Sequence, residues 1–124
     1  MRWAWSCLTG LMLLSGPAFI PGAQAQLWPS NLRTSGLSRQ DLDIMGRATS
    51  GLYRSDSAQV GQSGHWHNPA TGNSGSATLI RTTQIRGMPC RVLRYDIRTS
   101  RPQRTRSYLL NWCHTQENQW RIVH

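Results

Sequence analysis

Two cysteines, Cys90 and Cys113, constrain the fold of this 124-residue chain more than any other feature. If they face each other across an antiparallel pair of strands, the turn falls midway, between Arg101 and Pro102. That point lies inside Ser-Arg-Pro-Gln at positions 100–103, the most turn-like segment in this part of the chain. The spacing therefore predicts a β-hairpin closed by a disulfide, which adds about 3 kcal/mol of stability in the chain-entropy model.

The N-terminus predicts the oxidising environment that such a disulfide requires. Arg2 precedes an apolar run around Leu8–Leu14, and small residues follow, a pattern typical of a secretory signal peptide. The apolar run is too short to cross about 30 Å of hydrocarbon. We therefore expect residues 1–25 to be removed together with Cys7, which leaves an even pair of cysteines. The predicted product is a soluble, exported protein, located in the periplasm or at the outer membrane.

A helix is predicted near the start of the mature chain. Residues 26–36 mix proline, serine, asparagine and glycine without a period, so they are predicted to form an extended lead-in. Ser38 and Asp41 then have the spacing of a capping box, which predicts a helix from about residue 39 to residue 54. One face of this helix carries Leu42, Met45, Ala48, Thr49, Leu52 and Tyr53. An amphipathic helix of this kind needs a larger element to pack against.

The rest of the chain predicts that larger element, a meander of antiparallel strands. β-branched and aromatic residues recur between turn clusters after Val60. The predicted strands are Val60–His67, Ser76–Ile85, Cys90–Thr99, Arg104–His114 and Trp120–Val123. The predicted fold class is α+β, with one N-terminal amphipathic helix packed on a sheet of four or five strands and one disulfide. It forms a single domain over residues 37–124.

Four tryptophans follow the leader. Trp66, Trp112 and Trp120 fall on predicted strands, where we expect them to pack in the core or on the sheet. Trp28 falls in the lead-in, so it is the one that we expect to be exposed. Core packing is a better account of these rings than carbohydrate binding.

The segment GHWHNPATGNSGSATL, residues 64–79, combines two kinds of signal. His65 and His67 have a metal-ligand spacing, and His114 could complete a zinc or copper site. The same histidines could provide general acid and base in a small secreted hydrolase or nuclease. Asn68-Pro69 and the glycines that follow are, however, sufficiently explained as a hairpin connection. We expect the connection, with no metal and no cofactor, and keep the metal site and the hydrolase as alternatives.

This segment also resembles a known signature. The residues that carry the resemblance are Trp66, Asn68, Thr71, Gly72, Asn73, Ser74 and Gly75. Together with Cys90-Arg91 and the later cysteine, tryptophan and Ile122-Val123, they are similar to the C-terminal domain of the rickettsial-type seventeen-kilodalton surface antigen family. The resemblance implies an envelope or surface protein with a helix on a small antiparallel sheet, and it implies no known catalysis.

The charge of the chain indicates what such a protein could bind. All fourteen basic residues are arginine, against five acidic residues, for a net charge of +9. An excess of this kind attracts phosphates, carboxylated glycans and nucleic acid. Arg98, Arg101, Arg104 and Arg106 surround the predicted hairpin turn and form the candidate anion-binding group. A solvated hairpin tip, protected by charge from edge aggregation, is an equally good interpretation of these four residues.

The sequence therefore predicts a non-catalytic, exported cell-envelope protein. Its role is structural, or it binds an anionic envelope component, lipopolysaccharide or cell wall, through the arginine-rich hairpin. We expect no enzymatic activity, no specific nucleic acid and no transmembrane helix.

Overall fold

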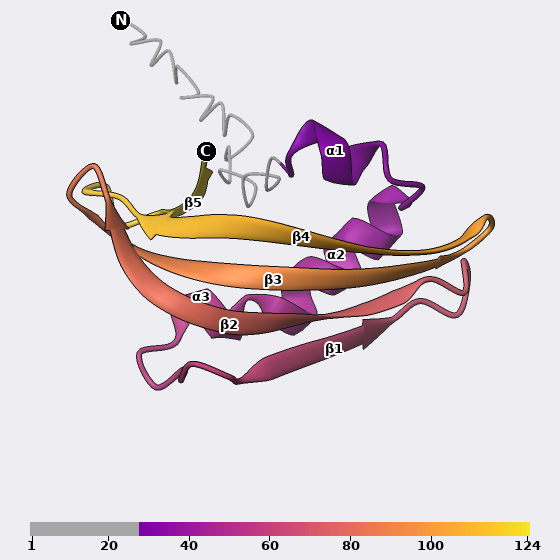
Figure 1. Cartoon of the computed structure of the whole chain (residues 1–124), viewed down its shortest axis with the longest axis horizontal. Helices are drawn as coiled ribbons and strands as arrows, with labels where there is room; N and C mark the ends of the chain where they lie inside the picture. The colour runs from indigo at the N-terminus through magenta and orange to yellow at the C-terminus, as the bar shows by residue number, and fades with distance from the viewer. Residues whose placement is uncertain (1–27) are drawn as a thin grey trace, which may run out of the picture.

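The computed structural model describes residues 28–124, which form three short helices and one antiparallel sheet (Figure 1). The elements are α1 (Ser30–Arg33), α2 (Arg39–Thr49), α3 (Gly51–Arg54), β1 (Ser63–His67), β2 (Ser74–Ile85), β3 (Met88–Ser100), β4 (Gln103–His114) and β5 (Trp120–Val123). The strands follow one another in the sheet in chain order, as a meander. A five-stranded antiparallel sheet, a short helix and one disulfide are thus confirmed. The predicted signal peptide, residues 1–25, lies outside the described residues.

The capping box that predicted α2 is present in full. The Asp41 amide donates to Ser38 Oγ at 3.0 Å, and the Ser38 amide donates to Asp41 Oδ2 at 2.8 Å. The predicted helix over residues 39–54 is divided at Ser50, where α2 gives way to α3. Gly51, a poor helix former, stands directly after the break.

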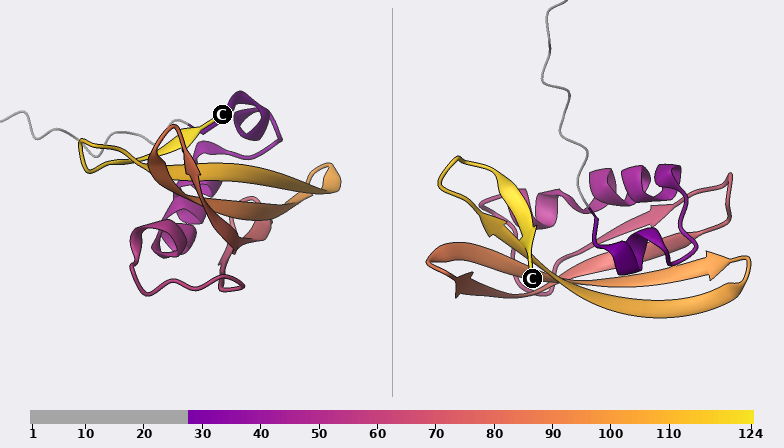
Figure 2. Two further views of the ribbon diagram at one scale, coloured as in Figure 1. Left: turned by 60° about the vertical axis from the view of Figure 1, so that its left-hand side comes forward. Right: turned by 90° about the horizontal axis from the view of Figure 1, so that it is seen from above.

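The core lies between the helices and one face of the curved sheet (Figure 2). We call this the core face; it carries Leu93, Tyr95 and Leu110. Tyr53 of α3 stacks on Trp112 with ring centroids 4.0 Å apart, and Trp112 Nε1 donates to Tyr95 Oη at 2.9 Å. These aromatic contacts join α3 to two neighbouring strands, β3 and β4.

The disulfide and the register of the β3–β4 hairpin agree with the prediction from cysteine spacing. Cys90 and Cys113 are bonded and stand directly opposite each other, with Cα atoms 4.0 Å apart. The last pair before the turn is Ser100 with Gln103. The turn therefore falls at Arg101 and Pro102, because no bulge shifts the register between the cysteines and the turn.

The prediction of an extended lead-in with an exposed Trp28 is wrong for the part that the structure describes. Residues 30–33 form α1, which begins after Pro29, and Leu32 is fully buried. Trp28 is only 6% exposed, because its ring packs edge-on against Tyr95 and Trp112 with both centroid distances at 5.9 Å. Local composition does not show that this segment covers part of the core face. Trp66 and Trp112 are buried, as predicted, and the Trp120 ring is half-buried.

Candidate functional site

The signature segment between β1 and β2 converges on one buried carboxylate. Asn68 Nδ2 and Thr71 Oγ1 each donate to Asp41 Oδ1 at 2.7 Å, and Asn73 Nδ2 donates to Asp41 Oδ2 at 2.8 Å. The Ser38 amide adds the fourth donor. The loop is thereby tied to the first turn of α2, since all four bonds end on the same side chain.

The Asp41 carboxylate is held in its charged form. Burial raises its pKa, but the hydrogen bonds from Thr71, Ser38, Asn73 and Asn68 together outweigh burial and leave the pKa below its ordinary value. A carboxylate with four donors and a lowered pKa is a poor general acid or base near neutral pH. The structural role of this carboxylate, which joins α2 to the loop, is sufficient to explain why a charged group is buried here.

The two glycines of the signature are required by the backbone. Gly72 has φ +73°, a conformation that favours glycine. A Cβ on Gly75 would stand 2.5 Å from the Asp96 carbonyl oxygen and 2.8 Å from Trp66 Nε1, so only glycine lets the strands approach here. The Asn73 side chain adds a further tie, because its Oδ1 accepts from the Ser100 amide at 2.9 Å. The signature residues thus connect the β1–β2 hairpin to α2 and to β3.

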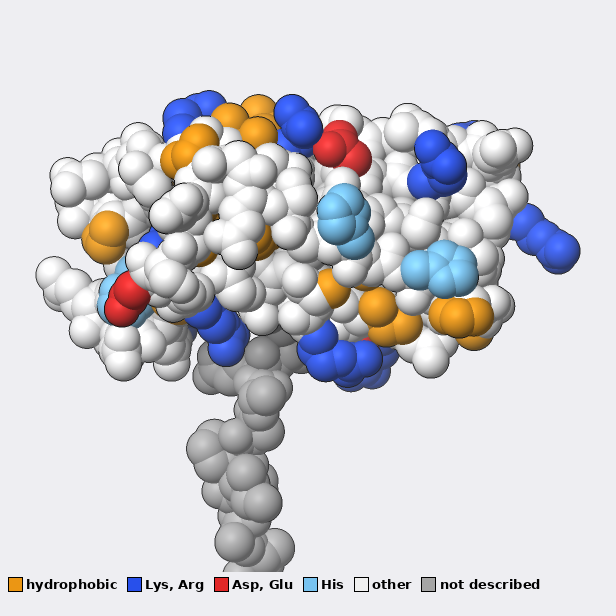
Figure 3. All heavy atoms as spheres, turned by 90° about the horizontal axis from the view of Figure 1, so that it is seen from below, with side chains coloured by type: hydrophobic (Ala, Val, Ile, Leu, Met, Phe, Trp, Pro, Cys, Tyr) orange, Lys and Arg blue, Asp and Glu red, His pale blue; other side chains and the backbone are white. Residues whose placement is uncertain are grey.

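The structure does not bring the three candidate histidines together. His65 and His67 lie exposed on β1, level with Ser76 and Ser74 of β2. His114 lies next to the disulfide, at the far end of the sheet, roughly 23–30 Å away along the strands at about 3.3 Å per residue. Figure 3 shows histidines at the surface as separate groups.

His114 is occupied by local contacts instead. Its ring stacks on Trp120 with centroids 4.9 Å apart, and its Nε2 makes a hydrogen bond of 2.7 Å with Asn118 Oδ1. Within residues 28–124, no three His, Cys, Asp or Glu side chains are grouped closely enough to hold a metal ion. The geometry that a three-histidine metal site needs is therefore missing from this part of the chain.

The four candidate arginines are all exposed, but the hairpin divides them between its two faces. Arg98 pairs with Thr105 across the hairpin, whereas Arg106 pairs with Ile97 and Arg104 with Thr99. Because side chains alternate along a strand, Arg104 and Arg106 lie on the core-face side with Ile97 and Thr99. Arg98 lies on the opposite side, which we call the open face, and Arg101 lies in the turn. The group surrounds the tip and is not one flat patch.

Most arginines in the described part of the chain have no carboxylate partner. Thirteen of the fourteen arginines lie in residues 28–124. Among them only Arg94 forms an ion pair, at 3.1 Å from Asp96. Ser107 also donates to Asp96, at 2.6 Å. The pKa of Asp96 is below its ordinary value, because the hydrogen bond from Ser107 and the contacts with Arg94 lower it by more than burial raises it. Arg91 has a structural role, because its Nη1 donates to the Leu52 and Ser55 carbonyl oxygens of the helical layer.

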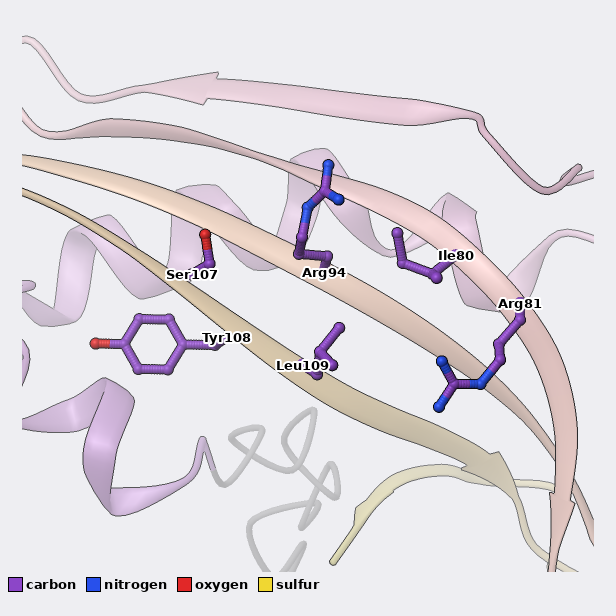
Figure 4. A pocket seen from close by; sticks show the side chains of 6 residues that line it. All are labelled: Ile80, Arg81, Arg94, Ser107, Tyr108 and Leu109. Atoms are coloured by element: carbon purple, nitrogen blue, oxygen red, sulfur yellow. The ribbon is translucent and has the colours of Figure 1, made fainter.

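A shallow depression lies on the open face, across β2, β3 and β4 (Figure 4). It encloses about 460 Å³ and is lined by Ile80, Arg81, Arg94, Ser107, Tyr108 and Leu109. Ile80 reaches it at a bulge, where the β2–β3 register shifts between Leu79 and Arg81. No sequence feature predicts this depression, because the bulge has no glycine or proline to mark it.

No family model, no curated protein and no solved structure matches the chain. The resemblance to surface antigens therefore stays a prediction. In the described residues, no helix has the length and apolar character needed to cross a bilayer.

Proposed function

We propose that this is a non-catalytic, exported envelope protein of the surface-antigen type that binds an anionic envelope component through the tip of the β3–β4 hairpin. The ligand chemistry is a phosphate or carboxylate, as presented by lipopolysaccharide or by the cell wall. One observation carries the proposal: the tip gathers Arg98, Arg101, Arg104 and Arg106, all exposed, and no carboxylate among the described residues pairs with them.

The electrostatics favour an external anion at this tip. Four cations on one hairpin tip repel one another, and this cost falls when anions bind them. One guanidinium group can donate two parallel hydrogen bonds to a phosphate or carboxylate group. A tip that carries several such groups, on both faces, can therefore bind a surface with many anionic groups. Near an anionic lipid surface each arginine contributes about 1 kcal/mol, so four contribute about 4 kcal/mol, close to a thousandfold in affinity.

The other polar clusters are engaged in contacts that stabilise the fold. Asn68, Thr71 and Asn73 donate hydrogen bonds to the Asp41 carboxylate. The His114 ring stacks on Trp120 and forms a hydrogen bond with Asn118. The leader pattern and the disulfide support an oxidising compartment, where the abundant anions are those of the envelope. These observations favour binding over catalysis.

The test is retention of the purified protein on two anionic surfaces, at rising salt. One surface is phosphatidylcholine vesicles doped with lipopolysaccharide, against undoped vesicles, and the other is isolated peptidoglycan. The hairpin variant replaces Arg98, Arg101, Arg104 and Arg106 by glutamine. The control replaces four exposed arginines of the helical layer by glutamine: Arg33, Arg39, Arg47 and Arg54.

Both variants lose the same net charge, so they separate a local site from a general charge effect. We expect the hairpin variant to lose salt-sensitive retention and the control to keep most of it. Equal losses in the two variants would show that total charge, and not the hairpin, drives binding. The surface that retains the wild-type protein identifies the source of the anion.

A further inference from the structure

The β4 strand has an open edge along most of its length. β5 pairs only with residues 111–114 of β4, whereas β3 pairs with residues 103–113. From Gln103 to Leu110, β4 therefore has a neighbouring strand on one side only among the described residues, and Figure 1 shows β4 running on well beyond β5. Such an edge exposes backbone donors and acceptors that can pair with another strand.

The register shows which backbone groups face outward. Residues directly opposite each other in an antiparallel pair alternate between a close, non-hydrogen-bonded type, with Cα atoms about 4.5 Å apart, and a wider hydrogen-bonded type. Cys90 and Cys113, at 4.0 Å, are of the close type. By alternation, Thr105, Ser107 and Leu109 are of the close type too, so their N–H and C=O groups point away from β3.

An independent contact supports this assignment. On β3, Ser100 has the same parity as Cys90, so its amide should point away from β4. It does, because the Ser100 amide donates to Asn73 Oδ1 at 2.9 Å, on the β2 side. Three successive outward residues of β4 thus present a regular ladder of six backbone groups that no strand within residues 28–124 pairs with.

The side chains along this edge differ between the two faces. Arg104 and Arg106 lie on the core-face side, and both are exposed. On the open face, Leu109 is 60% exposed and lines the depression together with Ser107 (Figure 4). A strand added to β4 would have side chains alternating between Arg104 and Arg106 on one side and, on the other, the depression with its exposed apolar residue Leu109.

We propose that the free edge of β4 binds an extended peptide in which acidic residues alternate with apolar ones. The acidic side chains pair with Arg104 and Arg106, and an apolar side chain lies against Leu109 in the depression. A second copy of this chain fits less well, because antiparallel self-pairing along this stretch gathers four arginines on one side. This inference goes beyond the proposed function, since its ligand is a protein strand.

The primary experiment is amide hydrogen exchange of the full mature protein, measured residue by residue by NMR. In the free protein the amides of Thr105, Ser107 and Leu109 exchange fast, whereas those of Arg104 and Arg106 are protected by β3. A capped peptide that alternates valine and glutamate slows the first three at least ten-fold. An isomer with the valines and glutamates in separate blocks leaves them unchanged.

Two variants distinguish backbone pairing from charge attraction. Thr105→Pro removes an outward N–H without breaking a β3 bond, and we expect about ten-fold weaker peptide binding, while Thr105→Val binds normally. Charge reversal by Arg104→Glu and Arg106→Glu abolishes binding of the glutamate peptide and creates binding of an alternating valine–lysine peptide. Thermal unfolding of each variant checks that the fold is kept.

The proposal is overturned if the outward amides are already protected in the free protein, if both isomeric peptides bind equally, or if Thr105→Pro binds as well as the wild type. Concentration-dependent protection without peptide would assign the edge to a second copy instead. Thr105→Pro keeps every arginine, so it retains binding to anionic vesicles. A failure of this inference is therefore distinguishable from a failure of the proposed function.

Discussion

Replacing Asp41 by asparagine tests whether the signature segment is a structural tie. The side chain keeps its shape, but one of its two oxygens becomes an NH₂ group. Each Asp41 oxygen accepts two hydrogen bonds, at distances of 2.7 to 2.8 Å. Whichever way the amide is oriented, two donors lose their acceptor and face another donor, and one of the two, the Asn68 or the Asn73 amide, is buried.

The expected loss of stability is large for a domain of this size. A hydrogen bond to a charged group contributes about 1.5–3 kcal/mol, and two are lost. The variant is spared the cost of burying a charge, so we expect a net loss of about 3–5 kcal/mol. Small domains have about 5–15 kcal/mol in all, so the melting temperature should fall by about 15–30 °C.

Equilibrium urea unfolding, followed by tryptophan fluorescence at several pH values, measures this loss. The matched control is Asp43→Asn, which removes the same charge from an exposed position of α2 and should change stability by less than about 0.5 kcal/mol. A loss below about 1 kcal/mol for Asp41→Asn would refute the reasoning.

The pH dependence gives a second readout. Because the folded pKa of Asp41 is lower than its unfolded value of about 4, its contribution to stability is fully present above pH 4 and is lost as the pH falls through the folded pKa. The difference between the wild type and Asp41→Asn should therefore shrink in acid. A difference that stays constant down to strongly acidic pH would show that the carboxylate charge is not what stabilises the loop.

Three further substitutions test other parts of the fold by the same unfolding assay. Replacing Cys90 and Cys113 together by serine should cost about 3 kcal/mol, and an unchanged midpoint would show that the disulfide adds nothing. Gly75→Ala should cost about 1–3 kcal/mol, because the added Cβ meets the Asp96 carbonyl oxygen at 2.5 Å. In Gly51→Ala the added Cβ meets nothing within 4 Å, so this control should stabilise the protein slightly. Equal effects of the two glycine changes would contradict the packing around Trp66. Trp28→Ala should cost about 3–5 kcal/mol, and a neutral result would return Trp28 to the exposed role that local composition suggests.

Features set by short-range chemistry were predictable from the sequence. The β3–β4 register follows from two cysteines and a turn midway between them, and the start of α2 follows from Ser38 and Asp41. The division of the arginines between two faces was also within reach. Since Cys90 and Cys113 share a face, strand alternation places Arg98 on that face and Arg106 on the other.

Features that depend on contacts between distant segments were not predictable. The position of Asp41 in the sequence predicts only a helix cap. In the structure Asn68 and Asn73, more than two dozen residues later, also donate hydrogen bonds to its carboxylate. Trp28 gave no local signal of burial, because its partners Tyr95 and Trp112 are distant in the sequence. In both cases the tertiary contact overrides what the local composition indicates.

The most direct test of the account is an NMR titration of the mature protein with phosphatidylcholine bicelles that carry phosphatidylglycerol. It reports the side-chain Nε–Hε signals of the arginines and the backbone amides in one experiment. The account predicts that the signals of Arg98, Arg101, Arg104 and Arg106 shift, while the amides of residues 68–75 do not. Shifts in residues 68–75 with unchanged hairpin arginines would contradict it, because the signature loop would then be the binding site and not part of the scaffold.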